Sequence, residues 1–527
     1  MHLHLHTVHQ PGASMEGHIY NAHTLGMKYI RFTDHDTRLG HDKRSVNGFD
    51  FTKGMLEYET DAGVTCGWEV IGRCEPTVSD SALKFSISGR GGIKFYTSGK
   101  KHSRALLSDV TLKLAMKHEL APGARLLIDV VLSQRPPDNK EAHLLYVIGE
   151  SLDSDYKHYA ALPLKESEDG CYTLEITRDA EGLPQVGGLD NAFGTVSFII
   201  EGEGSLSISS FEISSIYERD DLISRQRELA DEIGAKYGIK PFATTEISGA
   251  GQHKNCFSTS VPVLDYSKGK ISAEMAISHV LSHGGIFSYN HPFESSKYKR
   301  VPFTREELDG IVRYESETLA ENRVWGASLM EVGFPMGRGL FTLDDHLRLW
   351  DNLALSGVFI TGYGDSDSHK SNSAWFSGNN FASWIGVDDS LEYPIAEEVF
   401  NEAMVKGCVY MGDPVLFAGE VSLTCLGAEI GSVFEHNGGS FPIRLSIPKA
   451  EDTAVIRIIR SGECMLEDHP KNGKFEITVD FRPETDIEFI RAEMYNADGR
   501  CIMLTNPIYF VKNGSDIKIP EERKVTV

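Results

Sequence analysis

The sequence predicts an α/β protein in which a barrel of alternating strands and helices carries two all-β domains. Strand and helix patterns alternate in two separated stretches, 1–72 and 215–415. Short strands separated by Gly, Asp and Pro turns fill 73–214, and the same texture returns in 416–527. At 527 residues the chain is also too long for one ordinary hydrophobic core. We therefore expect a split barrel with an inserted, jelly-roll-like β-sandwich and a C-terminal β-sandwich.

The first forty residues predict a strand, a helix and a second strand. Residues 2–7 alternate His and Leu with the period of two that is typical of a strand. Ser14 is a candidate N-cap for a helix whose apolar residues recur at helical spacing until Gly26 ends it. Residues 28–33 (KYIRFT) then predict a β-rich strand.

The later part of the barrel repeats this alternation. Strands are predicted at 242–248, 286–289, 328–333 and 358–361. Helices are predicted at 219–237, 271–283, 342–357 and 394–406, and Ser272 is a candidate N-cap of the second. Strand and helix in alternation imply a parallel sheet or barrel.

The two β-rich regions contain short strands with alternating polarity. In the insertion these are 83–88, 93–96, 125–132, 195–201 and 206–208, and in the tail 443–447, 454–459, 475–479 and 487–495. The run from Gly89 to Gly92 (GRGG) is predicted to be a turn between two strands, since no flanking helix supports a phosphate loop. The insertion has no Trp between Cys74 and Ser214, which counts against a glycan-stacking platform.

Composition narrows the class of protein. Hydrophobic residues make up 41% and charged residues 24%, the balance of a soluble globular protein, and no apolar run approaches the roughly 20 residues of a membrane helix. The net charge of −24 argues against non-specific nucleic-acid binding, because basic patches hold phosphate backbones. The eight cysteines form no CxxC pair, and the first residues lack a basic and then apolar leader. We therefore expect free thiols and a cytoplasmic location.

Side chains that bind metals follow one predicted strand after another. In His4-Leu5-His6 the two imidazoles point to the same side of a strand, and in a βα barrel the strand ends build the active site. The candidates are His4, His6, Asp34, His35, Glu246, His253, His291, Asp367 and His369. Imidazoles and carboxylates together suit zinc, manganese or iron, and a carboxylate can bridge two ions. Any one of these histidines alone is more often an ordinary polar residue, but their succession predicts a metal site.

Two further residues compete for roles at this site. Glu69 in CGWEVIG is an alternative bridging carboxylate, but Glu246 ends a cleaner strand and has His253 seven residues on. Arg338 in FPMGRG follows a strand and could reach a substrate anion, although a solvated loop arginine is the commoner outcome.

The order HLHT, TDHDT, TEIS with a following His, NHP and GDSDSH resembles the polymerase-and-histidinol-phosphatase (PHP) superfamily. The resemblance covers about 1–72 and 215–415, and the tail with Thr505 to Tyr509 (TNPIY) is similar to the branch of carbaryl hydrolase-like metallohydrolases. It implies a distorted (βα)7 barrel with two or three divalent ions, Zn, Mn or Fe.

The resemblance also implies which residues bind each ion. It assigns a first ion to His4, His6, Glu246 and Asp367, and a second to His35, His253 and the shared Glu246. His291 and His369 complete the site or hold a third ion, and Asp34 matches a residue that ligates or orients. His2 stands where many relatives have Asp, and the stretch 8–17 lacks their Asp-Gly, so two ions are the expected number.

The expected activity is hydrolysis by a metal-activated water, with Asp34, Asp367 and His369 as the catalytic candidates and Asp367 or His369 relaying the proton. The leading hypothesis is a phosphoesterase that acts on a small phosphomonoester or phosphodiester. A carboxyl-ester, carbamate or amide hydrolase is the second. The third is a catalytically silent carbohydrate- or surface-binding protein.

Overall fold

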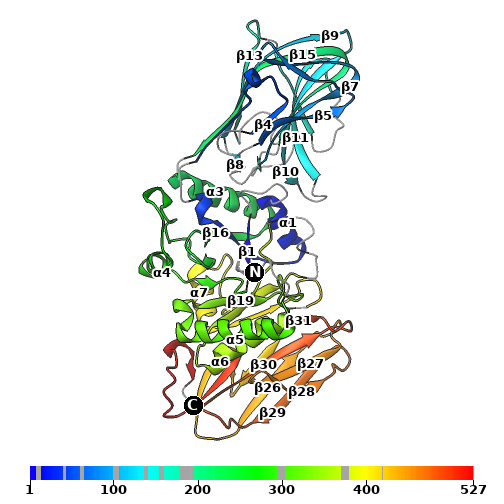
Figure 1. The fold of residues 1–527 in the computed structure, drawn as a ribbon. Helices are drawn as coiled ribbons and strands as arrows, with labels where there is room; N and C mark the ends of the chain where they lie inside the picture. Colours follow the sequence, from blue (N-terminus) through cyan, green and yellow to red (C-terminus); the bar gives the residue numbers. More distant parts are fainter. Residues whose placement is uncertain are drawn as a thin grey trace.

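The computed structural model describes residues 1–6, 14–39, 43–59, 65–98, 106–107, 109–135, 140–152, 159–165, 167–177, 191–192, 195–217, 219–293, 303–369, 375, 379–417 and 419–525. Of His2 and His4 only the backbone is described. The chain forms an elongated stack with one β-sandwich at the top, a mixed α/β region in the middle and a second β-rich region below (Figure 1). The N-terminus lies in the middle of the stack, and the C-terminus lies in its lower region (Figure 1).

The middle region contains two short sheets. In the first, β1 (His2–Leu5), β2 (Tyr29–His35) and β16 (Lys240–Ile247) are parallel, and β17 (Lys254–Cys256) is antiparallel to β16. In the second, β18 (Ser288–Tyr289), β19 (Leu329–Gly333) and β20 (Thr361–Gly364) are parallel. The expected distorted (βα)7 barrel is not confirmed, because these short strands fall into separate sheets joined by the isolated bridges Leu5–Ser368 and Cys256–Phe287.

Helices cover both sheets of this region. They are α1 (Met15–Thr24), the short α2 (Asp36–Leu39), α3 (Arg219–Tyr237), α4 (Ala273–Ser282), α5 (Arg305–Glu321), α6 (Leu343–Leu355) and α7 (Glu397–Lys406). The predicted N-caps are confirmed: Ser14 accepts a hydrogen bond from the backbone N–H of Gly17, and Ser272 accepts one from Met275. The analysis of the sequence did not predict α5, whose capping box joins Thr304 and Glu307.

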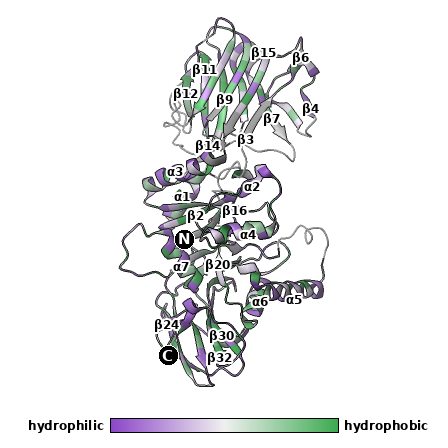
Figure 2. Cartoon of the chain, turned by 90° about the vertical axis from the view of Figure 1, so that its left-hand side faces the viewer, coloured by the Kyte–Doolittle hydropathy of each residue, from purple (hydrophilic) through white to green (hydrophobic). Residues whose placement is uncertain are grey.

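The inserted region is built around one long ribbon. Its eleven-stranded sheet contains β3 (Lys43–Gly48), β4 (Glu57–Glu59), β5 (Thr65–Gly72), β6 (Thr77–Ser79), β7 (Ala82–Ser98), β9 (Asp109–Leu120), β10 (Arg125–Arg135), β11 (Lys140–Gly149), β12 (Tyr159–Pro163), β13 (Cys171–Thr177) and β15 (Thr195–Tyr217). β8 (Leu106–Leu107) and β14 (Asn191–Ala192) pair separately. β7 and β15 pair along most of β7. Hydrophilic and hydrophobic residues alternate along strands of this sheet (Figure 2).

The turn predicted at Gly89–Gly92 was wrong, since these residues lie inside β7. A Cβ atom on Gly92 would lie 1.9 Å from the backbone oxygen of Phe198 in β15, so glycine permits a close approach of the two strands rather than a turn. β3, β4 and β5 also pair within this sheet, although residues up to 72 were expected in the barrel.

The tail forms two sheets against the middle region. A nine-stranded sheet contains β21 (Ala382–Ile385), β22 (Val409–Gly412), β25 (Val433–His436), β27 (Val455–Arg460), β28 (Glu463–Asp468), β30 (Ile487–Tyr495), β31 (Cys501–Thr505), β32 (Ile508–Lys512) and β33 (Lys524–Val525). A four-stranded sheet contains β23 (Ser422–Cys425), β24 (Ala428–Glu429), β26 (Phe441–Ile447) and β29 (Phe475–Phe481). The guanidinium of Arg491 in β30 donates to both carboxylate oxygens of Asp351 in α6, at 3.0 and 2.9 Å, and so fixes the tail to the middle region.

All eight cysteines are free thiols, as the sequence predicts. Across the described ranges, no helix combines the length and the apolarity that crossing a membrane requires.

Candidate metal centre

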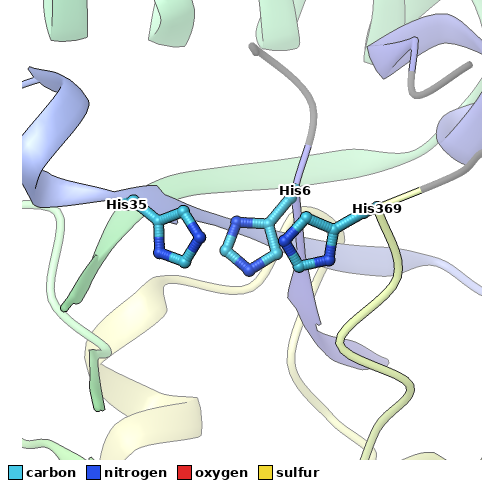
Figure 3. Close-up of side chains that lie close together, drawn as sticks. All are labelled: His6, His35 and His369. Carbon is cyan, nitrogen blue, oxygen red and sulfur yellow. The ribbon is translucent and has the colours of Figure 1, made fainter. Parts of the chain in front are cut away.

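Three histidines from distant parts of the sequence lie side by side at the ends of parallel strands (Figure 3). His6 follows β1, His35 ends β2, and His369 lies beyond the end of β20. The ring of His6 stacks on that of His369 with centroids 4.1 Å apart and lies 4.5 Å from that of His35. The backbone N–H of His6 donates to the carbonyl of Ser368 at 3.1 Å, which holds the first and third histidines together.

The carboxylate of Glu246 lies among four imidazoles. This side chain is fully buried near the end of β16. Its Oε2 lies 2.6 Å from Nδ1 of His35 and 3.7 Å from Nε2 of His6. Its Oε1 lies 3.0 Å from Nδ1 of His253 and 3.5 Å from Nε2 of His291. Each oxygen therefore faces a different pair of histidines, as a bridging carboxylate requires.

Two aspartates flank His6. Oδ1 of Asp367 lies 2.9 Å from its Nε2. Oδ1 of Asp34 lies 4.0 Å from its Nδ1, and Oδ2 of Asp34 accepts a hydrogen bond from Gln226 at 2.5 Å. Asp367 is thus in direct contact with the cluster, whereas Asp34 lies at its margin and is oriented by α3.

These donors fit divalent metal ions. Ligand atoms of His6, His35 and His369 lie within 4.8 Å of one another, and so do those of His35, Glu246 and His253. Zinc takes nitrogen and oxygen ligands at about 2.0–2.2 Å, so two ligands of one ion lie within such a separation. The contact of His35 with Glu246 is short but lacks the geometry of a hydrogen bond. The two ligand sets therefore overlap at His35, and the second contains the buried carboxylate of Glu246.

The backbone is strained at two of the candidate ligands. His291 has φ of 29° and Asp367 has φ of 46°, in the left-handed region that side chains with a Cβ rarely adopt. Strain of this kind persists where the surrounding structure over-determines a position, and it concentrates at functional sites.

Glu331 is a site residue that the sequence analysis missed. Its Oε2 accepts hydrogen bonds from Nδ1 and from the backbone N–H of His291, both at 2.7 Å. A carboxylate acceptor places the hydrogen on Nδ1, so Nε2 of His291 faces Glu246 and His253 as a ligand nitrogen.

The other oxygen of the Glu331 carboxylate has a donor of its own. The hydroxyl of Tyr363 donates to Oε1 of Glu331 at 3.2 Å. Burial, with the carboxylates of Glu331 and Asp365, raises the pKa of Tyr363 well above its usual value, so the hydroxyl keeps its proton. The sequence signal that could have revealed Glu331 is a single acidic residue inside an apolar strand, LMEVG.

Asp36 fixes the loop that carries His253. Its carboxylate accepts from the backbone N–H groups of Ser248 and Gly249, at 2.9 and 3.3 Å, and from the hydroxyl of Tyr266 at 2.5 Å. Burial raises the pKa of Asp36 above its usual range, against the opposing effect of these hydrogen bonds. The motif TDHDT thus supplies both a histidine of the cluster and the residue that holds the next loop.

The remaining predictions have mixed outcomes. The side chain of His4 lies outside the described residues, whereas Asp34, His6, His35, Glu246, His253, His291, Asp367 and His369 all lie in or beside the cluster. Glu69 is exposed in β5, within the inserted sheet. Arg338 is not a solvated loop arginine, because its guanidinium lies 2.5 Å from Oδ2 of Asp367. His18 of α1 is buried, and its Nδ1 accepts a hydrogen bond from the indole N–H of Trp375 at 2.7 Å.

Comparisons with known proteins give distant likenesses. No family model and no curated protein matches the chain. It is similar to a two-domain protein from Bacteroides vulgatus that contains a predicted PHP-like metal-dependent phosphoesterase, with 14% identity, 54% of this chain and 79% of that chain covered, and a TM-score of 0.27. The chain is also similar to a family 12 xyloglucanase from Bacillus licheniformis, with 11% identity, 33% of this chain and 100% of that chain covered, and a TM-score of 0.22. A family 11 carbohydrate-binding module from Clostridium thermocellum matches with 13% identity, 32% of this chain and 94% of that chain covered, and a TM-score of 0.16.

TM-scores this low leave the function of the chain to be inferred from its own residues. The comparisons give no support to the carbaryl hydrolase-like branch that the tail suggested.

Proposed function

We propose that this protein is a metal-dependent hydrolase, and specifically a phosphoesterase that acts on a small phosphomonoester or phosphodiester. The observation that carries the proposal is the buried carboxylate of Glu246 among His6, His35, His253 and His291. Burying a carboxylate costs several kcal/mol unless cations or hydrogen bonds compensate it, so a cluster of this kind is suited to divalent ions.

We propose that the two sheets of the middle region form a distorted seven-stranded barrel. Three backbone hydrogen bonds between the sheets support closure: His6 N–H to Ser368 O at 3.1 Å, Asn290 N–H to His253 O at 3.0 Å and Phe257 N–H to Ile286 O at 2.9 Å. We keep the division into a split barrel, an insertion and a tail, with the insertion running from about 43 to 217, because β3 to β5 pair within its sheet.

The side chains would hold two ions in this proposal, Zn, Mn or Fe. His6, Asp367 and Glu246, with His4 as the sequence suggests, would hold the first. His35, His253 and Glu246 would hold the second, and His291 would complete the set. His369 would either join this set or relay a proton, since its Nδ1 lies on a backbone carbonyl and one nitrogen is left for both roles. When bound, such ions supply a Lewis acid and a water that is acidic near neutral pH.

His369 is suited to move a proton at the open side of the centre. Its Nδ1 lies 2.9 Å from the backbone carbonyl oxygen of Asp367. Because a carbonyl only accepts, Nδ1 carries the hydrogen and Nε2 is the basic nitrogen. The side chain is about a third exposed, at 29%, so it can exchange protons with solvent. An unchanged dependence of rate on pH in His369→Asn would exclude this role.

The guanidinium of Arg338 supplies a cation in contact with Asp367. A planar guanidinium can engage a carboxylate and a phosphoryl oxygen together, because its N–H donors point in different directions. Arg338 is therefore suited to bind the anionic part of the substrate at the edge of the centre.

The proposal is tested by measuring phosphate release from a panel of phosphomonoesters and phosphodiesters, with Mn²⁺ or Zn²⁺ added. We expect metal-dependent turnover that Glu246→Gln abolishes. Glu69→Gln is the matched control, since it removes the exposed carboxylate of the inserted sheet and leaves turnover unchanged. Carboxyl esters, carbamates and amides complete the panel. Turnover of these alone, by protein shown to hold metal, would replace phosphoester hydrolysis with the second hypothesis.

A further inference from the structure

A rigid hairpin stands beside the centre and follows β19. This hairpin, residues 334–341, contains two consecutive turns, in which the N–H of Gly337 donates to Phe334 at 2.7 Å and Arg338 pairs with Phe341 through bonds of 2.8 and 3.2 Å. Gly337 has φ of 73°, and a Cβ atom there would lie 2.1 Å from the oxygen of Phe341. Only glycine fits this position, so the turn depends on Gly337.

Aromatic rings anchor the base of the hairpin to the centre. Phe341 stacks on Phe293, with centroids 4.2 Å apart and planes at 15°, and Phe293 lies two residues after His291. Phe334 packs against His346, with centroids 5.8 Å apart. Burial lowers the pKa of His346 to about 4, so this ring is neutral near pH 7 and the base is uncharged.

A third anchor holds the outer turn. The side-chain amide of Asn379 donates to the carbonyl of Gly337 at 3.0 Å, and its Oδ1 accepts from the N–H of Met336 at 2.8 Å. The hairpin is therefore held at its base by aromatic packing and at its flank by hydrogen bonds to its backbone.

The hairpin carries one cation, and an exposed apolar residue stands two positions before it and two positions after it in the sequence. The guanidinium of Arg338 contacts Asp367 and lies 5.2 Å from the ring centre of Phe334, which limits its direction. Met336 is 70% exposed and Leu340 is 48% exposed. Isolated apolar side chains are common on protein surfaces, but here they stand two residues before and two residues after the arginine that contacts Asp367, a candidate metal ligand.

We propose that this hairpin selects the substrate, with Arg338 binding the phosphoryl oxygens and with Met336 and Leu340 contacting an apolar group esterified to the phosphate. The inference rests on the proposed function and narrows it to aryl and alkyl phosphate esters, in preference to esters of polyols and sugars. Contact with an apolar group is expected to give a roughly tenfold or larger preference.

The test compares phenyl phosphate with glycerol phosphate as substrates of the Mn²⁺-loaded full chain. We expect a higher kcat/KM for phenyl phosphate, and we expect the double variant Met336→Ser/Leu340→Ser to lower the ratio of the two values about tenfold. Met275→Ser is the matched control, because Met275 is 59% exposed on α4 and lies outside the hairpin, and it leaves the ratio unchanged. Calorimetry with phenylphosphonate and methylphosphonate gives a second readout that needs no turnover. Arg338→Gln weakens binding of both about tenfold or more, whereas the double variant weakens binding of phenylphosphonate selectively.

The outcomes separate the two proposals. Hydrolysis of both esters with a ratio that the double variant does not change would overturn the role of the hairpin and leave the phosphoesterase standing. Selective binding of phenylphosphonate without hydrolysis of any phosphate ester would overturn the phosphoesterase and leave selection by the hairpin standing. Neither binding nor hydrolysis, by protein that holds metal, would overturn both.

Discussion

The middle region and the inserted region both have apolar cores, but they differ in how many polar side chains they bury. Within the described part of residues 43–217, the buried polar side chains are Asp129 and Ser197. The core of that region is formed instead by apolar and aromatic residues such as Trp68, Phe95 and Phe198. Around the candidate metal centre, the buried polar side chains are His6, Asp34, Glu246, His291, Glu331 and Asp365.

Polar burial costs free energy that apolar burial does not, so its location indicates where selection has kept chemistry at the expense of stability. The inserted region also contains a histidine–carboxylate pair outside any such cluster. His143 lies 2.9 Å from Asp129, but no further ligand atom joins the pair in the metal groups found among the described residues. A single histidine beside a carboxylate is therefore weak evidence for a metal site, and several histidines that share one carboxylate are strong evidence.

The largest expected effect comes from breaking matched histidine–carboxylate pairs in the two regions. His6→Ala removes a partner of Asp367 and Glu246, and we expect turnover to fall roughly a thousandfold or more with loss of bound metal. We expect His143→Ala, which breaks the pair with Asp129, to leave turnover and bound metal unchanged. Metal content by mass spectrometry and initial rates measure the difference. Equal losses in the two variants would remove the distinction between the regions.

The core of the insertion gives the next effect. Phe198→Ala removes a fully buried ring that packs on Trp68 and Phe211, and we expect the free energy of unfolding to fall by about 3–5 kcal/mol. Ser210→Ala, at an exposed position of the same strand, is the control. Urea denaturation measures the change, and metal content per folded molecule stays constant. Loss of metal from folded Phe198→Ala would mean that the two regions are not independent.

Glu331 orients His291 and gives a smaller effect. Glu331→Gln exchanges a charged acceptor for a neutral amide, and we expect metal affinity to fall roughly 10–100-fold. Tyr363→Phe removes the donor to the other oxygen of Glu331, together with hydrogen bonds to three neighbouring polar side chains, and we expect it to lower the metal affinity less. Competition with a chromogenic chelator measures both affinities. An effect of Tyr363→Phe as large as that of Glu331→Gln would assign the role to the network rather than to the carboxylate.

The smallest effect is the pH dependence that His346 causes. Burial lowers its pKa from 6.5 to about 4, so between these values the unfolded chain binds a proton that the folded chain does not. Stability is therefore lost as pH falls from 6.5 towards 4. Between pH 7 and pH 5.5, we expect the free energy of unfolding of His346→Gln to rise by about 1 kcal/mol relative to that of the parent protein. Denaturation curves at the two pH values measure this gain, and parallel changes in both proteins would exclude it.

Local signals predicted much of the fold. Helix α3 and strand β30 have the bounds predicted from the sequence, and both N-caps lie where Ser14 and Ser272 indicated them. The strand ends likewise brought the candidate ligands together, because parallel strands place their carboxyl ends at one edge.

What could not be predicted depends on pairing between distant residues. The continuous β7–β15 ribbon requires knowing that Gly92 faces Phe198, and the role of Glu331 requires knowing that His291, forty residues earlier, is its partner. Arg338 was expected to be solvated for the same reason, since its partner Asp367 is 29 residues away.

The pairing of β3 with the end of β15 has a consequence for modularity. Lys43 and Tyr217 are opposite each other in this antiparallel pair, so the chain enters and leaves the inserted region at adjacent points. Opposite residues in such a pair have Cα atoms only about 5 Å apart, a gap that a tight turn can span. The insertion can therefore be gained, exchanged or deleted as one cassette, while the host fold keeps its connectivity and its ligand geometry.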